Sequence, residues 1–349
     1  MTPPLGWAMG LAFGLPAMQL LHANQPFPSH YRGAAIAIGN FDGMHRGHQS
    51  LIGTAIAGAS SSGAAKGLVT FEPHPRTFFR PAEPVFRLTP LPLKARLAGS
   101  LGLDFVLSFD FDATLASLPP EEFVETHLVR RMGLRHLVTG YDFHFGKGRK
   151  GSPDTMRDLG RQHGFTTTVV DQVTDDNGLA PFSSSAIRNA LAHGRLNDAA
   201  HDLGYNWMVL GEVVHGDHRG REIGFPTANI VVDEGVEPLQ GIYAVFVRDA
   251  EIAGSPRRLG AGYFGKRPTF DTDRTFLEVY ILDFSGDLYG RKLLVEFVAL
   301  IRPDQKFTSI DELVVQMHRD CDEARRLLAM ADANPANSRL GELQRAGMI

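Results

Sequence analysis

The sequence has a single cysteine, Cys321, among 349 residues. An intramolecular disulfide is therefore excluded, and the chain suits a reducing compartment such as the cytoplasm. An excess of charge of one sign is also lacking, because the formal net charge is only −4. This balance excludes a global attraction to nucleic acid or to an anionic membrane, so any phosphate must be bound by a local site.

The first 31 residues contain no Asp, Glu, Lys or Arg. A secretory signal peptide needs a basic start and an unbroken apolar core, whereas prolines and glycines interrupt this stretch. The stretch is also short for a membrane span. We therefore expect residues 1–31 to be an extension that is poorly ordered or covers an apolar surface.

The length of the chain favours two domains, and the pattern of segments changes near residue 203. Before it, strand-like and helix-like segments alternate, which predicts an α/β domain with a doubly wound, Rossmann-like parallel sheet. After it, short strands follow one another across glycine turns, which predicts a small antiparallel β-barrel. The expected strands are 34–38, 67–71, 105–109 and 136–140 in the first domain, and 208–214, 228–232, 242–248, 258–264, 275–282 and 293–302 in the barrel.

The predicted domain boundaries are 32–203 and 204–330. A capping box from Ser309 to Glu312 opens an amphipathic helix whose apolar stripe is expected to pack on the barrel. Residues 331–349 are expected to be a frayed tail.

Residues 39–48 read GNFDGMHRGH, between an apolar run and a helical pattern. A strand, a tight loop and a helix N-terminus in this order leave N–H groups and the positive end of a dipole for a polyphosphate. His45 and His48 lie three apart on one helical face, where both can donate to phosphate oxygens. Two histidines beside a glycine can also be an accident of the loop, and zinc would require more ligands. The candidate phosphate contacts are Gly39, Phe41, Asp42, Gly43, His45, Gly47 and His48.

Two further segments of the first domain have the composition of an anion site. Residues 141–151 combine glycines, aromatic rings and cations, which can stack a planar ring and neutralise phosphate, although a solvated basic turn has the same composition. Ser183, Ser184 and Ser185 cap a helix expected over 186–192, with Arg188 in its first turn. A cation there opposes the helix dipole, which favours an anion bound between the serines and Arg188 over an ordinary N-cap.

The barrel segment contains Thr227 and Asn229 beyond a loop shaped by Gly224 and Pro226. Hydroxyl and amide oxygens are hard ligands of the kind that Mg²⁺ prefers, and Mg²⁺ arrives with ATP. Glu278 lies within an apolar strand-like run, where an acid is costly unless it is paired or used. It is a candidate base for an attacking hydroxyl, unless it simply occupies a solvated strand face.

Seven spaced motifs resemble, in order, those of the bacterial bifunctional riboflavin kinase/FAD synthetase family over residues 31–328. They are GNFDGMHRGH at 39–48, FEPHP at 71–75, GYDFHFGKGRKG at 140–151, SSSAIR at 183–188, GFPTAN at 224–229, GKRPTF at 265–270, and LEVYILDF with DLYG within 277–290. Several motifs in one order are far more specific than any one of them.

The resemblance implies two active sites that use ATP and Mg²⁺ and act on riboflavin, FMN and FAD. The first domain would adenylylate FMN to FAD, and the barrel would phosphorylate riboflavin to FMN. Small molecules are then the expected partners, with no nucleic acid and no membrane. By the same resemblance, His45 and His48 would hold the ATP phosphates in the first domain, and Ser184, Ser185 and Arg188 would hold the pyrophosphate. The flavin would be bound by Asp142, Phe143, Phe145 and Arg267. In the barrel, Gly224, Thr227 and Asn229 would hold phosphate and Mg²⁺, and Glu278 would accept the proton of the ribityl hydroxyl.

The chain departs from the family pattern at two places. Ser185 and Ala186 stand where the family usually has threonine and a basic residue, so we expect weaker holding of pyrophosphate but an active site. Tyr263 and Phe264 are bulky where the family often has asparagine or a small residue. Two other readings are a related nucleotidyltransferase with a different acceptor, and a flavin-binding regulator without catalysis; the GFPTAN motif and the retained His45, Arg188 and Glu278 speak against them.

Overall fold

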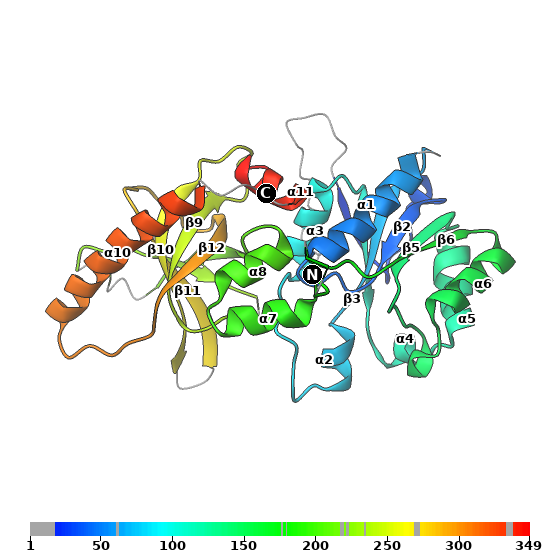
Figure 1. Ribbon diagram of the computed structural model, residues 1–349, viewed down its shortest axis with the longest axis horizontal. Coiled ribbons are helices and arrows are strands. Elements are labelled where there is room, and N and C mark those ends of the chain that lie inside the picture. The colour runs from blue at the N-terminus through cyan, green and yellow to red at the C-terminus, as the bar shows by residue number, and fades with distance from the viewer. Residues whose placement is uncertain are drawn as a thin grey trace. The chain divides into compact units, whose positions relative to one another are not determined.

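The structure is a computed structural model that describes residues 18–60, 63–175, 177–178, 180–216, 220, 223–233, 235–268, 273–332 and 338–349. The chain divides into two compact units, which are described separately below. The first comprises Met1–Val85 and Lys94–Phe182, and the second comprises Phe86–Leu93 and Ser183–Ile349. Figure 1 labels their elements.

The first unit contains a six-stranded parallel sheet, which confirms the predicted doubly wound architecture. The strand order is β1-β4-β3-β2-β5-β6, so the direction of winding reverses at β2. Strands in such a sheet are buried on both faces, which explains their continuous apolar runs. The strands are β1 (Gln19–His22), β2 (Ala35–Ile38), β3 (Lys66–Glu72), β4 (Phe105–Asp110), β5 (His136–Gly140) and β6 (Thr166–Val170).

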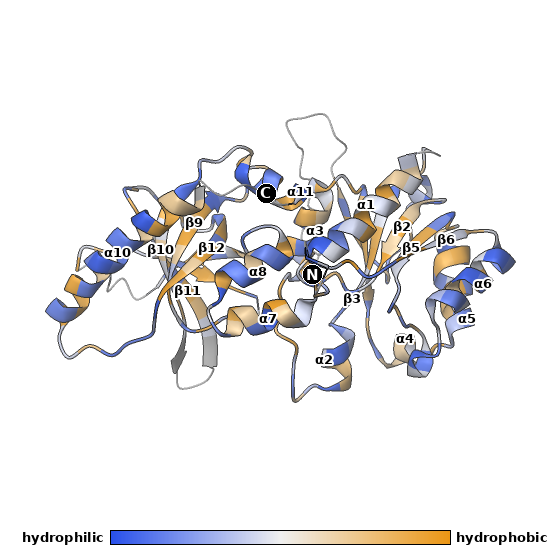
Figure 2. Ribbon diagram, in the orientation of Figure 1, coloured by the Kyte–Doolittle hydropathy of each residue, from blue (hydrophilic) through white to orange (hydrophobic). Residues whose placement is uncertain are grey.

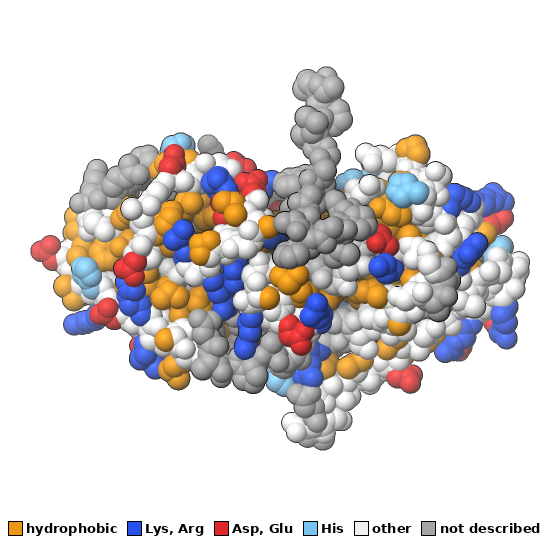
Figure 3. All heavy atoms as spheres, turned by 90° about the horizontal axis from the view of Figure 1, so that it is seen from above, with side chains coloured by type: hydrophobic (Ala, Val, Ile, Leu, Met, Phe, Trp, Pro, Cys, Tyr) orange, Lys and Arg blue, Asp and Glu red, His pale blue; other side chains and the backbone are white. Residues whose placement is uncertain are grey.

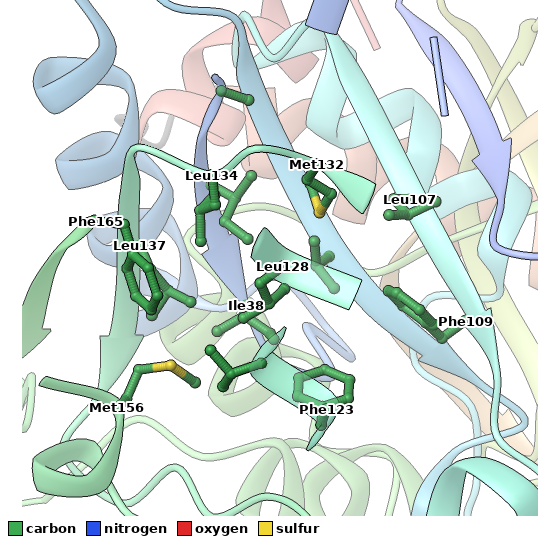
Figure 4. Packing of buried hydrophobic residues seen from close by; sticks show 14 of the residues in the cluster. Ile38, Leu107, Phe109, Phe123, Leu128, Met132, Leu134, Leu137, Met156 and Phe165 are labelled. Atoms are coloured by element: carbon green, nitrogen blue, oxygen red, sulfur yellow. The ribbon is translucent and has the colours of Figure 1, made fainter. Parts of the chain in front are cut away.

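Helices of the first unit cover both faces of this sheet. On one face, α1 packs on β2, β3 and β5. On the other, η2 and α6 bury the core cluster of Figure 4, in which Leu128 and Met156 meet Ile38 and Leu137. The helical segments are η1 (Ser29–Tyr31), α1 (Arg46–Ser60), α2 (Pro75–Phe79), α3 (Leu91–Ser100), α4 (Ala113–Ser117), α5 (Pro120–Phe123), η2 (Val124–Arg131), η3 (Lys147–Arg149) and α6 (Pro153–His163).

After α5 the chain continues as η2, which is a π-helix rather than an α-helix. Its end is capped by the Arg32 guanidinium, which donates to the carbonyls of Arg130 and Arg131 at 3.1 and 2.5 Å. A π-helix leaves a wider turn than the α-helical pattern predicts, and no local sequence signal announced it.

Residues 18–31 are not an extension outside the domain, and this part of the sequence-based expectation is wrong. β1 pairs in parallel with β4 at the edge of the sheet, and the Ala23 N–H donates to the carbonyl of Ser108 at 2.9 Å. Tyr31 is buried against Phe105, with ring centroids 4.8 Å apart. The strand was missed because it is only four residues long and carries no alternation. Residues 1–17 lie outside the described part of the chain.

The second unit contains the predicted six-stranded barrel, closed in the order β10-β11-β8-β7-β12-β9. Every pairing around it is antiparallel. Side chains alternate inward and outward, so Leu277 and Val279 are fully buried while Glu278 between them is half-buried. The strands are β7 (Met208–Val214), β8 (Ala228–Val231), β9 (Gly241–Asp249), β10 (Arg258–Pro268), β11 (Asp273–Ile281) and β12 (Lys292–Pro303).

The expected amphipathic helix is α10 (Ile310–Asp332), which packs on β9, β10 and β12. Ala324 and Leu328 of this helix are fully buried, whereas Ile310 at its start is 65% exposed. Figure 2 shows the mixture of apolar and polar faces on this helix. Arg302 of β12 adds a bidentate ion pair with the buried Asp320, at 2.8 and 3.0 Å.

Residues 338–349 are not frayed, contrary to expectation. Helix α11 (Arg339–Arg345) buries Leu340 and Leu343, and the Gln344 amide bonds both backbone groups of Asn206. Two other helices, α7 (Ser184–Ala192) and α8 (Leu196–Leu203), also belong to this unit by their contacts.

The surface of the described residues shows no single dominant charge. On the face seen in Figure 3, basic and acidic side chains are interspersed. Among the described helices, none combines the length and the hydropathy that a membrane crossing requires.

Candidate functional sites

The loop after β2 lies where the strand order of the sheet reverses, which is where ligands gather in open α/β sheets. All six strands run the same way, so the loops after β2, β3 and β5 share one edge. Helix α1 begins at Arg46, directly after this loop. Its N-terminal N–H groups and dipole are therefore presented at the ligand-binding edge.

His45 caps this helix, and this contact determines which ring nitrogen can donate. The N–H of His48 donates to His45 Nδ1 at 3.3 Å. Because Nδ1 accepts this hydrogen bond, a neutral His45 ring carries its proton on Nε2. The His45 and His48 rings stack with centroids 3.7 Å apart and planes 21° apart.

The backbone of this loop is held in an unusual conformation. Phe41 and Met44 have φ of 48° and 41°, which non-glycine residues rarely adopt, and both side chains are fully buried. The carbonyl of Met44 accepts from the Gln49 amide at 2.9 Å. The carbonyl of Asn40 accepts from Thr70 Oγ1 and from the Lys94 ammonium at 3.1 and 2.9 Å. Sequence reasoning missed Lys94, because its motif-free position in α3 gives no signal.

The serine motif forms a helix start, but the helix begins two residues earlier than predicted. Ser183 is the N-cap, and its Oγ accepts from the N–H of Ala186 at 3.1 Å. Helix α7 therefore starts at Ser184, which places Arg188 in its second turn rather than its first. The Arg188 Nε donates to the carbonyl of Phe86 at 2.7 Å, and this hydrogen bond orients the Arg188 side chain.

His45 and His48 belong to the first unit, whereas Ser184, Ser185 and Arg188 belong to the second. Their convergence on one phosphate group stays a prediction. Within the first unit, the guanidinium of Arg46 lies over the ring of Phe182, 4.7 Å from its centroid. Phe182 is the residue directly before the N-cap of α7.

The loop after β5 is closed by a pair of hydrogen bonds between the backbones of Phe145 and Gly151. Phe145 is 7% exposed and belongs to the core, whereas Phe143 stacks on it at 5.6 Å and is half-buried. Asp142 is exposed, as are the cations of the loop. Of the predicted flavin contacts in the loop, Phe143 and Asp142 are thus the accessible ones.

Aromatic rings also gather after β3 and β4, and the sequence analysis overlooked them. Phe78, Phe79 and Phe111 contact one another with centroids 5.2 to 5.8 Å apart, and Phe71 meets Phe111 at 6.1 Å. Phe79 is 65% exposed, which is unusual for so large an apolar side chain. The signal was present in the two phenylalanines that follow the FEPHP motif.

The second candidate site lies on the outer face of the barrel. Asn229 of β8 is directly opposite Glu278 of β11. Paired residues of an antiparallel ladder have Cβ atoms about 4.5–5.5 Å apart on the same face of the sheet. Thr227, two residues before Asn229, precedes β8, and all three side chains are half-buried. The structure thus brings together the three residues that the sequence assigned to this site.

The backbone lies close to the polar side chains of this site. A Cβ on Gly216 would overlap the Asn229 amide, and one on Gly220 would meet Thr227 Oγ1 at 3.6 Å. Two glycines therefore let the backbone approach the polar side chains closely. Gly224, with φ of 88°, shapes the same loop. The Arg267 side chain, predicted to bind flavin, lies outside the described part.

The oxygens of this site suit Mg²⁺. Thr227 and Asn229 supply a hydroxyl and an amide carbonyl, and Glu278 supplies a carboxylate opposite them. Mg²⁺ commonly takes only one or two protein ligands and completes its shell with water and substrate phosphates. Within the described residues no cluster of three or more His, Cys, Asp or Glu could hold a metal ion.

Two further contacts flank this site, and the one between His215 and Tyr289 was not expected from the sequence. His215 stacks on Tyr289 with centroids 3.8 Å apart, next in the chain to Gly216. Tyr263, the bulky departure from the family pattern, pairs with Glu278 on the other side of β11. Its hydroxyl contacts Asp304 Oδ2 at 3.3 Å.

A helix N-terminus at the reversal point of a parallel sheet, joined to a barrel that aligns hydroxyl, amide and carboxylate oxygens, defines a two-domain transferase for phosphorylated nucleotides. The FAD synthetase family matches residues 27–185, and the riboflavin kinase family matches residues 203–328. The chain belongs to the family of bifunctional riboflavin kinase/FMN adenylyltransferases, and it carries both enzymatic domains in that family's order.

The similarity extends over most of the chain. The Pseudomonas fluorescens bifunctional riboflavin kinase/FMN adenylyltransferase is 40% identical over 89% of this chain and 98% of its own. The protein of the same name from Escherichia coli K12 is 39% identical over 82% of this chain and 90% of its own. A solved structure from Streptococcus pneumoniae, described as a macrolide-efflux protein, has a TM-score of 0.73 and 28% identity, covering 88% of this chain and 98% of that one.

Proposed function

We propose that the loop after β2 is the adenylyl-transfer site and that the outer face of β8 and β11 is the kinase site. The alignment of Glu278 with Asn229, remote in sequence and adjacent in the barrel, carries the second assignment. The His45-capped start of α1 at the reversal point of the sheet supports the first. The two sites would perform successive steps, from riboflavin to FMN and from FMN to FAD.

In the adenylyl-transfer step, an oxygen of the FMN phosphate attacks the α-phosphorus of ATP. A P–O bond forms there, the bond to the β-phosphate bridge breaks, and its electron pair leaves with pyrophosphate. The Nε2–H of His45, the His48 ring and the N-terminus of α1 would hold the phosphates and stabilise the growing charge. Ser184, Ser185 and Arg188 would hold the pyrophosphate, as the resemblance implies.

In the kinase step, Glu278 would accept the proton of the ribityl 5′-hydroxyl while the oxygen of that hydroxyl attacks the γ-phosphorus of ATP. The bond to the ADP oxygen breaks, and ADP leaves with the electron pair. Thr227 and Asn229 would hold Mg²⁺ and phosphate oxygens. Bound Mg²⁺ would neutralise the triphosphate and orient it.

For the flavin ring of the first site, we propose the aromatic edge formed by Phe79 and Phe111, with Phe143 and Asp142 from the loop after β5. Exposed rings at the ligand edge of a sheet offer stacking to a planar substrate. Phe145 would then support Phe143 from the core. Arg267 is retained as a flavin contact of the barrel.

The substrates are therefore small molecules, and we place the enzyme in the cytoplasm with its nucleotide pools. Three features favour this: the balanced surface charge, the single cysteine and the nature of the substrates. Its predicted domain boundaries of 32–203 and 204–330 also remain proposals.

A complementation experiment tests the two-site assignment. Protein is incubated with riboflavin, ATP and Mg²⁺, and flavins are separated chromatographically. We expect Glu278→Gln to make no FMN from riboflavin but to convert supplied FMN to FAD, and His48→Ala to stop at FMN. Mixing the two variants should restore FAD from riboflavin. Loss of both reactions in either variant would contradict two separate sites, and binding without any product in the wild type would favour a flavin-binding regulator.

A further inference from the structure

Lys94, in the part of α3 that belongs to the first unit, is a charged side chain that no motif announced. It is 2% exposed. Its ammonium donates to the carbonyl of Asn40 at 2.9 Å, to Thr70 Oγ1 at 3.1 Å and to Glu72 Oε1 at 3.1 Å. Three donors thus meet three acceptors, which is what a buried ammonium requires.

The first of these acceptors belongs to the loop after β2. The Asn40 carbonyl receives both Lys94 and Thr70 Oγ1, so two donors set the plane of the peptide that enters Phe41. Phe41 begins the strained part of the loop, with φ of 48°, and Met44 follows with 41°. A conformation of this kind is unfavourable and persists only where the surroundings of the residue over-determine it.

The other two acceptors lie on β3. Thr70 is fully buried within the strand, and Glu72 is its last residue, directly before the FEPHP prolines. Lys94 therefore ties the end of β3 to the loop after β2. These two segments are neighbours at the edge where the nucleotide is proposed to bind.

We propose that Lys94 is a positioning residue for adenylyl transfer: through the Asn40 carbonyl it holds the strained loop in the conformation that places His45 and His48 on the ATP phosphates. This inference rests on the proposed assignment of that loop to ATP. Lys94 touches no substrate in this account. Its charge is neutralised by Glu72, and its hydrogen bond to Asn40 carries the effect.

A purely structural ion pair makes a different prediction. If Lys94 only neutralised Glu72, removing the lysine would strand a half-buried carboxylate, and neutralising that carboxylate would repair the defect. If Lys94 acts through Asn40, the repair would restore stability but leave the loop without its donor. The two accounts therefore separate in a double variant.

The experiment measures FAD formation from FMN with ATP varied, FMN formation from riboflavin, and thermal unfolding, on the full chain. For Lys94→Met we expect kcat/KM for ATP in FAD formation to fall about 10- to 100-fold. The KM for FMN and the rate of riboflavin phosphorylation should stay within about twofold, because the barrel is untouched. Lys66→Met, at the opposite end of β3, is the matched control and should behave as wild type.

The double variant Lys94→Met/Glu72→Gln decides the mechanism. We expect it to unfold near the wild-type temperature while FAD formation remains as low as in Lys94→Met. Glu72→Gln alone keeps an oxygen for Lys94 and should retain FAD formation within about threefold. Recovery of FAD formation in the double variant, or an equal loss in Glu72→Gln alone, would overturn the inference.

His48→Ala is measured in parallel, so that a failure of the ATP-site assignment can be distinguished from a failure of the inference about Lys94. If His48→Ala leaves FAD formation intact, the assignment of the loop to ATP fails, whatever Lys94 does. If His48→Ala abolishes FAD formation but Lys94→Met does not impair it, only the inference about Lys94 fails.

Discussion

Glu278 and Asn229 are 49 positions apart in the sequence and directly opposite each other in the β11–β8 ladder. The pairing places a carboxylate beside an amide on the outer face of the barrel, with Thr227 two residues before the amide. Leu277 and Val279 on either side of Glu278 point into the barrel and are fully buried. The acid is therefore held at its place by the packing of its neighbours.

The first prediction concerns the role of Glu278 as a base. Glu278→Gln keeps the shape of the side chain but cannot accept a proton, so we expect kcat for riboflavin phosphorylation to fall about 10²- to 10⁴-fold with little change in KM for riboflavin. Glu212→Gln, an exposed acid on β7, is the matched control. A variant with kcat within threefold of wild type would exclude Glu278 as the base.

The second prediction separates the two roles of His45. His45→Ala removes both the cap of α1 and a phosphate donor, so it should cost about 0.5–2 kcal/mol of stability and lower FAD formation. His45→Asn retains an oxygen that can cap the helix. We therefore expect His45→Asn to preserve the unfolding temperature but not the rate of FAD formation. His163→Ala is the control and should change neither. Full activity of His45→Asn would show that capping is the only role of this residue.

The third prediction concerns pH and stability. Burial lowers the pKa of His127, with Arg131 lowering it further, and burial also lowers the pKa of His136. As the pH falls below the ordinary histidine pKa of about 6.5, these two histidines are protonated more readily in the unfolded chain than in the folded chain. The free energy of unfolding therefore decreases as the pH falls. Calorimetry between pH 8 and 5 should show the unfolding temperature decreasing.

The contribution of one of these histidines can be isolated. His127 contacts Phe109 and Phe123 at 5.0 and 5.6 Å, so His127→Phe keeps an aromatic ring there and removes the titrating group. The decrease in unfolding temperature at low pH should become smaller in this variant and not in His163→Gln. An unchanged slope in His127→Phe would argue that this ring does not contribute.

The fourth prediction concerns the C-terminal helix α11. The Gln344 amide accepts from the Asn206 N–H at 2.8 Å and donates to the Asn206 carbonyl at 2.9 Å. Gln344→Ala leaves both groups without this partner, which should cost about 1–3 kcal/mol and lower the unfolding temperature. Arg345→Ala, on the exposed side of the helix, should leave the unfolding temperature unchanged. Equal stability of the two variants would mean that α11 contributes little.

The sequence by itself determined the elements whose signals are local. The apolar runs and the alternation between strand and helix were sufficient for the four central strands of the parallel sheet, because strands covered by helices on both faces must be apolar throughout. Six strands separated by turns were sufficient for the barrel. Ser309 and Glu312 announced α10, since caps depend only on neighbours along the chain.

Only the tertiary structure decided what depends on contacts between remote segments. Strand β1 was missed because four residues carry too little pattern, and its pairing with β4 defines it. The sequence of residues 338–349 does not predict an ordered segment. Their order depends on tertiary contacts such as the hydrogen bonds between Gln344 and Asn206. Lys94 reads as an ordinary helical lysine, and its burial depends on acceptors 22 to 54 positions away. Hydrogen bonds and packing across the fold set these features, and a local sequence pattern does not record them.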